Sequence, residues 1–481
     1  QGIRQQQKED LEALEALSPE LDERQQAEIA LRQAGYEWLL GRDEDTAAAL
    51  EQSITLARAC QALDLLAAAY ALKGRMIRDQ VQARPALEKG LKLARKAGLQ
   101  ALEGDILRWL GNSYYWQHQY SHSRHHLESA LAIHRSVGDL RGELSALNNL
   151  GLLSQQVGQP QQAREFYQQA LVSCQKIGDR LAEGVLLTNL GALTAQLGDF
   201  GPAQTWLEQA LAIREDIQND EGVGMVLNHL GEVYQQQGHY GDALASYQRG
   251  LEINTAIPHP VQRCESLTGL ANLYRELGAY EQAQQFSRQA LQAINDPASP
   301  QLAAALAQAS LLYHELGEHQ RALETGLQAL ELAEAVPHIA AAAQTHSALA
   351  LSALRRYPEA RQRFQQALEL RQSLSQTHLV PEVLSGLAQA DLAQERQADA
   401  LARVEEILQT WQTNRMAGPL RLPHIHLTCY RVLQHHQDRR AAAVLQAALE
   451  LLQTRAATIP DDDLRRSYLQ LVHANREIQN L

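Results

Sequence analysis

The sequence predicts an all-α protein built as a solenoid of stacked helix-turn-helix units. The first observation is a short motif that returns every 40 residues, at Leu110, Leu150, Leu190, Leu230 and Leu270. The second is a composition dominated by Ala, Leu and Gln, with 14 Pro in 481 residues and no alternating runs of Val, Ile and Thr. Stacked repeats extend one core along a line, so a chain of this length need not divide into several globular domains.

The repeated motif is L-G-x6-G-x-[YF]-x2-A-x6-A-L. Its turn glycine is Gly158, Gly198, Gly238 or Gly278, and His118 stands at this place in the first copy. The first Ala is Ala163, Ala203, Ala243 or Ala283, and the motif closes at Ala130-Leu131, Ala170-Leu171, Ala210-Leu211, Gly250-Leu251 and Ala290-Leu291. Five copies in the same register indicate a true repeat.

Each repeat is expected to contain two helices. Leu144, Leu147, Leu150 and Leu153 have helical spacing and give the first helix an apolar stripe. Gly158 stands where this helix must end, because Gly adopts the left-handed conformation freely. The fixed small residues are expected where the paired helices touch, whereas the variable positions face solvent or a ligand.

This pattern resembles the tetratricopeptide repeat, in the forty-residue form found in kinesin light chains and bacterial signalling ATPases. The resemblance rests on the Leu-Gly pair, the Tyr three residues after it (Tyr114, Tyr234, Tyr274), the two Ala positions and the aromatic residue at Tyr167 or Tyr247. It is strongest over residues 104–295. It implies antiparallel helix pairs that stack into a right-handed superhelix with a concave inner groove.

Weaker copies of the motif extend the array on both sides. We expect a leading helix at 1–26, repeats one to seven over 27–295, degenerate repeats eight to eleven over 296–460, and a single closing helix at 461–481. Each repeat is expected to lean only on its sequence neighbours, so a chain cut after Asn295 would stay folded.

Composition and missing motifs exclude several functions. The net charge of −13 without a Lys/Arg run argues against a nucleic acid or a membrane as partner. No P-loop or nucleophile elbow occurs, and the two His of "HELGEH" (314–319) are five residues apart, which does not suit a zinc protease. His122 and His126 could share a helix face and bind a metal, but surface histidines are the favoured interpretation. We therefore expect no enzyme, no cofactor and no metal.

The expected ligand site is the concave groove. In tetratricopeptide proteins the first helix of each pair lines this face, at the fifth, sixth, ninth and twelfth positions when the Leu of Leu-Gly is the seventh. The predicted ligand-binding residues are Arg108, Asn112, Tyr115, Asn148, Asn149, Gln155, Asn189, Asn228, His229, Glu232, Asn272 and Arg275. Asn149 and Asn189 match the sixth-position Asn that related scaffolds use to bind a peptide backbone. Alternatively, these amides bond to neighbouring helices and stabilise the superhelix.

The function that the resemblance implies is recognition. We expect the sensor region, with an autoinhibitory role, of a larger cytoplasmic bacterial regulator of the STAND class (signal-transduction ATPases with numerous domains). It would bind a peptide, a protein or a small effector in the groove and adjoin an NTPase domain of the same polypeptide. The alternatives are a free-standing scaffold for two proteins, or a support domain fused to a catalytic unit.

Overall fold

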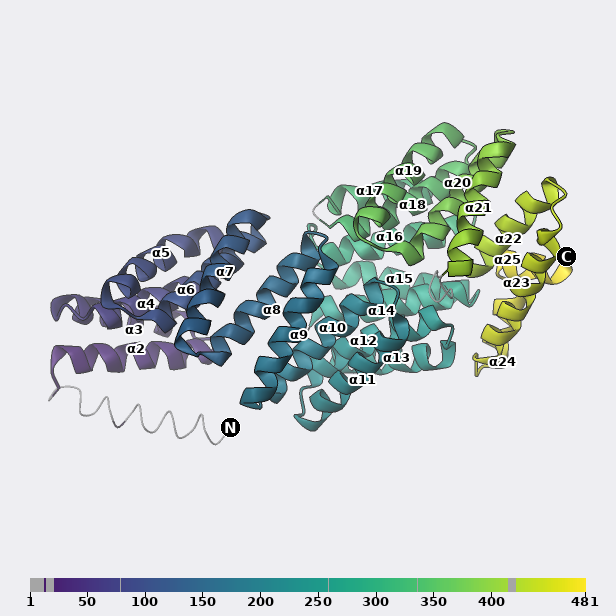
Figure 1. Ribbon diagram of the computed structural model, residues 1–481. Coiled ribbons are helices and arrows are strands. Elements are labelled where there is room, and N and C mark those ends of the chain that lie inside the picture. Colours follow the sequence, from purple (N-terminus) through teal and green to yellow (C-terminus); the bar gives the residue numbers. More distant parts are fainter. Residues whose placement is uncertain (1–12, 14–20, 78, 258, 335, 414–420) are drawn as a thin grey trace. The chain divides into compact units, whose positions relative to one another are not determined.

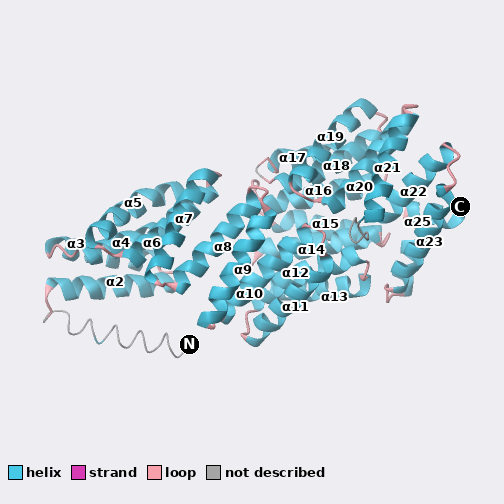
Figure 2. Cartoon of the chain, in the orientation of Figure 1, coloured by secondary structure: helices cyan, strands magenta, loops and turns pink. Residues whose placement is uncertain are grey.

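The computed structural model describes residue 13 and residues 21–77, 79–257, 259–334, 336–413 and 421–481. These residues form helices and contain no strand (Figure 2). Most of the expected leading helix at 1–26 lies outside the described residues, and 23–26 belong to the helix that follows. None of the described helices is both long and apolar enough to cross a membrane.

The chain divides into two compact parts, which we call the N-terminal part (1–157 and 161–179) and the C-terminal part (158–160 and 180–481). Figure 1 labels their helices. The first part contains α2 (Glu23–Leu39), α3 (Asp43–Ala59), α4 (Leu63–Met76), α5 (Gln80–Ala97), α6 (Gln100–Trp116), α7 (Tyr120–Val137), α8 (Leu140–Gln156) and nearly all of α9 (Pro160–Ile177).

The C-terminal part contains the remaining helices. They are α10 (Arg180–Gln196), α11 (Phe200–Asp216), α12 (Asp220–Gln237), α13 (Tyr240–Ala256), α14 (Pro260–Glu276), α15 (Tyr280–Ala293), α16 (Pro300–Glu315), α17 (His319–Leu332), α18 (Pro337–Ala353), α19 (Tyr357–Ser373), the short 3-10 helix η2 (Thr377–Leu379), α20 (Val380–Ala393), α21 (Gln397–Thr413), α22 (Leu422–His435), α23 (Arg440–Ala457), α24 (Asp462–Gln470) and α25 (His473–Asn480). The first helices of successive repeats, α10 to α22 in even numbers, contact one another and form one layer.

The motif positions act as the sequence predicts. Gly158, Gly198, Gly238 and Gly278 have φ of 74°, 87°, 79° and 72°, the left-handed conformation that ends the first helix. The small residue after each Leu lies where two helices touch: a Cβ on Gly111 would stand 2.7 Å from Cγ of Leu127 on α7. The Leu residues at 110, 150, 190, 230 and 270 are all buried.

The prediction of one closing helix at 461–481 is wrong, because this segment forms the two helices α24 and α25. Asp461 caps α24 by accepting a hydrogen bond from the Leu464 amide at 2.8 Å, which confirms the capping role of the acidic stretch. Between the helices Val472 is extended. On one straight helix Tyr468 and Ile478 would lie about 15 Å apart along the axis. The break lets both enter the same buried cluster.

The expectation that repeats contact only their neighbours is also wrong in the C-terminal part. One buried apolar cluster joins Tyr240, Leu270 and Leu273 of repeats six and seven with Leu452, Tyr468 and other residues of the C-terminal helices. Thr458 Oγ1 donates to the carbonyl of Gly238 at 2.7 Å, and the amide of Gly241 donates to the carbonyl of Thr458 at 3.2 Å. The C-terminal helices therefore dock on the turns inside repeats six and seven.

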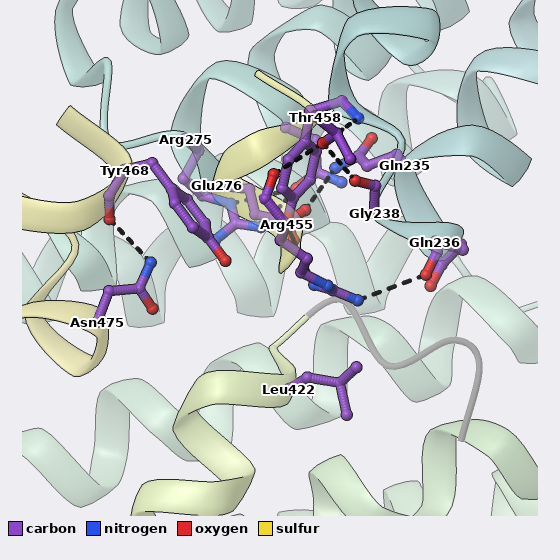
Figure 3. Close-up of polar contacts among 12 residues, drawn as sticks. Gln235, Gln236, Gly238, Arg275, Glu276, Leu422, Arg455, Thr458, Tyr468 and Asn475 are labelled. Atoms are coloured by element: carbon purple, nitrogen blue, oxygen red, sulfur yellow. Dashed lines mark hydrogen bonds and ion pairs between the residues drawn. The ribbon is translucent and has the colours of Figure 1, made fainter. Parts of the chain in front are cut away.

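A charged network lies beneath this contact (Figure 3). Arg455 Nη1 of α23 stands 3.3 Å from Glu276 Oε1 and donates to Tyr240 Oη at 3.1 Å. Tyr240 Oη donates to Glu276 Oε1 at 2.7 Å, and Gln235 Nε2 donates to Glu276 Oε2 at 2.9 Å. All four side chains are buried. Removing one partner of such a pair leaves a charge without compensation, so the contact holds the helices in a defined place.

The turn glycines also make room for the docked helices. A Cβ on Gly278 would lie 2.8 Å from the carbonyl oxygen of Ser467 in α24, and one on Gly238 would lie 2.9 Å from Cγ of Arg455. Gly317 holds the same place in repeat eight, with φ of 81°, and a Cβ there meets nothing within 4 Å. The same motif position therefore carries an additional packing constraint where another segment packs against the turn, as the C-terminal helices do at Gly238 and Gly278 and as His378 of η2 does at Gly198.

We predict that Gly278→Ala destabilises the chain more than Gly317→Ala does. Both changes place a Cβ on a left-handed residue, at about 1–2 kcal/mol, and Gly278→Ala adds an overpacking term of about 1–3 kcal/mol. Urea unfolding followed by circular dichroism measures the difference. Equal losses for the two variants would contradict the docking contact.

Candidate functional site

A cavity of about 490 Å³ lies in the C-terminal part. Its walls come mainly from the first helices α10, α12, α14, α16, α18 and α20, with Phe200 of α11, Tyr247 of α13, the end of α19 and η2. This volume lies within the range that small-molecule and peptide sites usually have. Apolar contacts come from Phe200, Leu311 and Ile339, and most of the other wall residues are polar.

Four of the predicted site residues line this cavity. Asn228, His229 and Glu232 come from α12, and Asn272 comes from α14. They occupy the fifth, sixth and ninth positions of the repeat, which are the positions expected to face inward. Gln235, at the twelfth position of the same repeat as Glu232, also lines the cavity. The register of the motif therefore locates the wall, although it does not show what the wall binds.

Two predicted residues have partners that fix helices in place. Asn228 Nδ2 donates to the carbonyl of Gln262 at 3.2 Å, and its Oδ1 accepts from Ser266 Oγ at 2.7 Å, so its amide ties α12 to α14. Arg275 forms a buried ion pair with Glu315 at 2.7 Å. Its Nη2 also donates to Asn272 Oδ1 at 2.7 Å, which orients that wall residue from behind the cavity.

The other predicted residues are half-buried and are not among those that line this cavity. They are Arg108, Asn112, Tyr115, Asn148, Asn149 and Gln155 in the N-terminal part, and Asn189 on α10. Asn149 Nδ2 donates to Asn112 Oδ1 at 2.8 Å, from α8 to α6. Arg108 donates to Asp105, and Gln155 accepts from Tyr167 Oη. The bond between Asn149 and Asn112 favours the alternative in which these amides link neighbouring helices.

Several wall residues were missed from the sequence. Glu265 precedes the groove positions that were counted in repeat seven, and Gln301, Gln308, Arg371 and His378 belong to repeats eight to ten or their junctions. In those repeats the Leu-Gly pair is absent, and no groove positions were counted there. One sequence signal could have found two of the wall residues. Glu265 and Glu382 occupy the same position of their repeats, each five residues before the seventh-position Leu.

Two carboxylates give one region of the cavity a negative potential. Burial raises the pKa of Glu265 to about 7, the charge of Glu232 raises it further, and a hydrogen bond from Gln301 opposes the shift. The surrounding protein atoms partly desolvate the Glu232 carboxylate and so raise its pKa as well, although its side chain is open to the cavity. Neither carboxylate forms an ion pair with Lys, Arg or His among the described residues. A cationic group entering the cavity would stabilise both ionised forms.

The cavity histidines are uncharged near neutral pH. Burial lowers the pKa of His229, His338 and His378 to about 4, and that of His346 to about 3. His346 Nδ1 donates to the carbonyl of Ala307 at 2.7 Å. These rings therefore offer neutral donors and acceptors, and they do not compete with the carboxylates for a cation.

Arg371, at the end of α19, is the cation of the wall. It is 8% exposed, and its Nη1 donates to Gln376 Oε1 at 2.5 Å. Its Nε makes no hydrogen bond among the described residues, and no described carboxylate lies within 4 Å of the guanidinium. Burial lowers the pKa of Arg371 to about 10, and the more distant Glu382 only partly offsets this effect.

The histidines considered as metal ligands have other contacts. The rings of His122 and His126 stack on Tyr114, with centroids 5.3 and 5.2 Å away. His314 lies on α16 and His319 begins α17, across the turn at Gly317. In the described part of the chain no three His, Cys, Asp or Glu side chains come together in a way that could hold a metal.

Comparison with known proteins identifies the repeat. A family model described as tetratricopeptide repeat matches residues 102–171, 142–216, 182–256, 222–295, 262–335 and 339–413. No curated protein matches the chain.

Among solved structures, the apo form of the quorum sensor NprR from B. thuringiensis is 13% identical with a TM-score of 0.50, over 71% of this chain and 97% of that one. A STAND protein with a tetratricopeptide repeat sensor from Pyrococcus horikoshii is 17% identical with a TM-score of 0.48, over 73% of this chain and 53% of that one. BtubC from P. vanneervenii is 19% identical with a TM-score of 0.40, over 45% of this chain and 89% of that one. At these identities the likeness concerns the fold alone.

We predict that Glu265→Gln stabilises the chain at high pH and not at low pH. Because the folded pKa of about 7 exceeds the ordinary value of 4.5, the folded state binds the proton more tightly. The stability of the wild type therefore falls as the pH rises from 4.5 to 7, by at most about 3 kcal/mol from this group.

Urea midpoints of the wild type and Glu265→Gln should coincide near pH 4.5 and diverge by pH 8, with the variant more stable. Glu252→Gln, on the exposed face of α13, serves as the control and should show no such divergence. A constant difference between wild type and Glu265→Gln across this pH range would refute the assignment.

Proposed function

Because the chain belongs to the tetratricopeptide repeat family, we propose that it is a recognition module whose cavity binds a peptide or a segment of a partner protein. The observation that carries the proposal is the cavity itself, which the layer of first helices surrounds with polar groups. The comparisons indicate no enzyme family. Recognition by this wall requires no catalytic step.

Unused hydrogen-bonding atoms in the wall support binding of a polar ligand. Gln236 Oε1, Gln308 Oε1 and His378 Nδ1 are buried and have no hydrogen-bond partner among the described residues. Buried polar groups in native proteins are nearly always satisfied. The amide groups of a peptide backbone supply both donors and acceptors, so a bound peptide would pair with these atoms. The apolar side chains of Phe200, Leu311 and Ile339 would contact its side chains.

We further propose that the module is the sensor region of a larger cytoplasmic regulator of the STAND class and adjoins an NTPase domain. The forty-residue form of the repeat, which resembles that of bacterial signalling ATPases, supports this role. The full reading frame in the source genome tests it. A P-loop domain in the same polypeptide agrees with the sensor role, whereas its absence would favour the free-standing scaffold.

The binding proposal predicts that Glu232→Arg removes the ligand. Glu232 is exposed inside the cavity, so a longer cationic side chain is tolerated by the fold and occupies the site. The chain is purified from its own host and its bound species are identified by native mass spectrometry. We expect the wild type to carry a bound peptide or protein segment and Glu232→Arg to lose at least nine-tenths of it.

Glu252→Arg is the matched control, because it makes the same change on the outer, exposed face of α13. It should retain the species as the wild type does. Retention of that species by Glu232→Arg, with an unchanged circular dichroism spectrum, would place the ligand outside this cavity.

A further inference from the structure

We infer that the cavity selects a short zwitterionic peptide, with its carboxylate at Arg371 and its ammonium group at Glu232 and Glu265. This inference rests on the proposed function and specifies the ligand chemistry of the same cavity. It is argued from three features of the wall: a buried guanidinium that forms no ion pair, two carboxylates that form none, and neutral groups at the other polar positions except Glu382.

The guanidinium of Arg371 is built to meet an anion from outside the chain. A buried arginine in proteins is normally paired with a carboxylate, because its charge is poorly solvated. Three of the four other buried arginines among the described residues follow the rule: Arg275 and Arg421 lie 2.7 and 3.6 Å from Glu315, and Arg455 lies 3.3 Å from Glu276. The fourth, Arg214, donates to Thr188 and Asn219 and does not line the cavity. Arg371 has only neutral partners, Gln376 and the carbonyl of His338, and its Nε is unused. A ligand carboxylate would complete its coordination.

The carboxylates of Glu232 and Glu265 are charged groups of the opposite sign that also lack an ion-pair partner among the described residues. Glu232 on α12 and Glu265 on α14 repel each other, and the hydrogen bond from Gln301 is the only contact that relieves Glu265 electrostatically among the described residues. Two carboxylates that share a site hold a cation more strongly than either alone. A primary ammonium group has three donors and can bond to both.

The remaining charged group that lines the cavity is Glu382 on α20, which lies near Arg371 without pairing with it. The four histidines of the wall are neutral. Apart from Glu382, the charges of the wall are segregated by element, with an acidic pair on α12 and α14 and a cation at the end of α19. A ligand that carries one charge of each sign matches this distribution.

The volume of about 490 Å³ limits the enclosed ligand to a short peptide. The two charges could come from its free termini or from acidic and basic side chains. We assign them to the termini, and the probes below separate the two sources.

The probe is a mixture of synthetic tetrapeptides, made without Asp, Glu, Lys and Arg, in four forms: free termini, N-acetylated, C-amidated and doubly blocked. Retention on the full chain is measured by equilibrium dialysis and mass spectrometry. On the wild type, amidation and acetylation should each lower retention at least tenfold. On Arg371→Gln the effect of amidation should fall below twofold, and on Glu265→Gln the effect of acetylation should do so.

Two variants serve as controls for folding and for charge. Arg363→Gln, on the same helix as Arg371, removes an arginine that donates to Gln344 and does not line the cavity, so it should behave as the wild type. Arg371→Lys keeps the positive charge and should keep at least part of the amidation effect. If Arg371→Lys keeps part of the amidation effect, the effect depends on the positive charge at this position and does not arise from lost packing of the Arg371 side chain.

The outcomes distinguish this inference from the proposed function. If doubly blocked peptides bind the wild type as well as free ones do, the cavity recognises peptides without terminal charges, and only the inference is overturned. The same holds if amidation weakens binding equally in the wild type and Arg371→Gln. If only a parallel mixture that contains Asp, Glu, Lys and Arg binds, the charges come from side chains and the assignment to termini is wrong. If no form in either mixture binds the wild type, peptide binding in this cavity is itself contradicted.

Discussion

The buried contact between Arg455 and Glu276 determines where the C-terminal helices lie. The two residues, both labelled in Figure 3, are 179 positions apart. Tyr240 and Gln235 complete the hydrogen bonding of the Glu276 carboxylate. Burial raises the pKa of Glu276 even though Arg455 opposes the shift. Loss of one partner from a buried pair of this kind costs about 3–5 kcal/mol, whereas an exposed pair contributes about 1 kcal/mol or less. The pair therefore specifies the register of docking, and the surrounding apolar cluster contributes most of the buried area.

Docking and the cavity share residues. Gln235 lines the cavity and donates to Glu276, and the carbonyl of the neighbouring Gln236 accepts from Arg455 at 3.5 Å. Tyr247, also in the wall, donates to Gln235 Oε1 at 3.4 Å. The side chains on this part of the wall are consequently held from behind by the helices that close the C-terminal part. A solenoid with contacts only between neighbours would leave Glu276 without its counter-ion and Gln235 without a fixed position.

The repeat itself could be read from the sequence, because its determinants are local. Leu150 and Gly158 recur at fixed spacing since each helix pair meets the same steric requirement. The wall positions of α12 and α14 followed from the same register, as Glu232 and Asn272 show. The docking contact could not be found in this way: Arg455 sits on an ordinary amphipathic helix, and nothing near it in sequence indicates a partner as distant as Glu276. Arg371 was missed for a different reason, since it lies at the end of the second helix of its repeat, whereas only first-helix positions were expected to line the groove. The role predicted for Asn149 stays a prediction, because an inward position can serve a helix contact, such as its bond to Asn112, as well as a ligand.

Hydrogen exchange at the start of α13 tests the docking most directly. The amides of Tyr240 and Gly241 stand in the first turn of the helix, where no intrahelical carbonyl is available, and they donate to Thr458 Oγ1 and to the Thr458 carbonyl, each at 3.2 Å. The amides of His319 and Gln320 occupy the same place in α17, and among the described residues they have no such acceptor. Docking predicts slow exchange at Tyr240 and Gly241 and fast exchange at His319 and Gln320. Equally fast exchange at all four amides would contradict it.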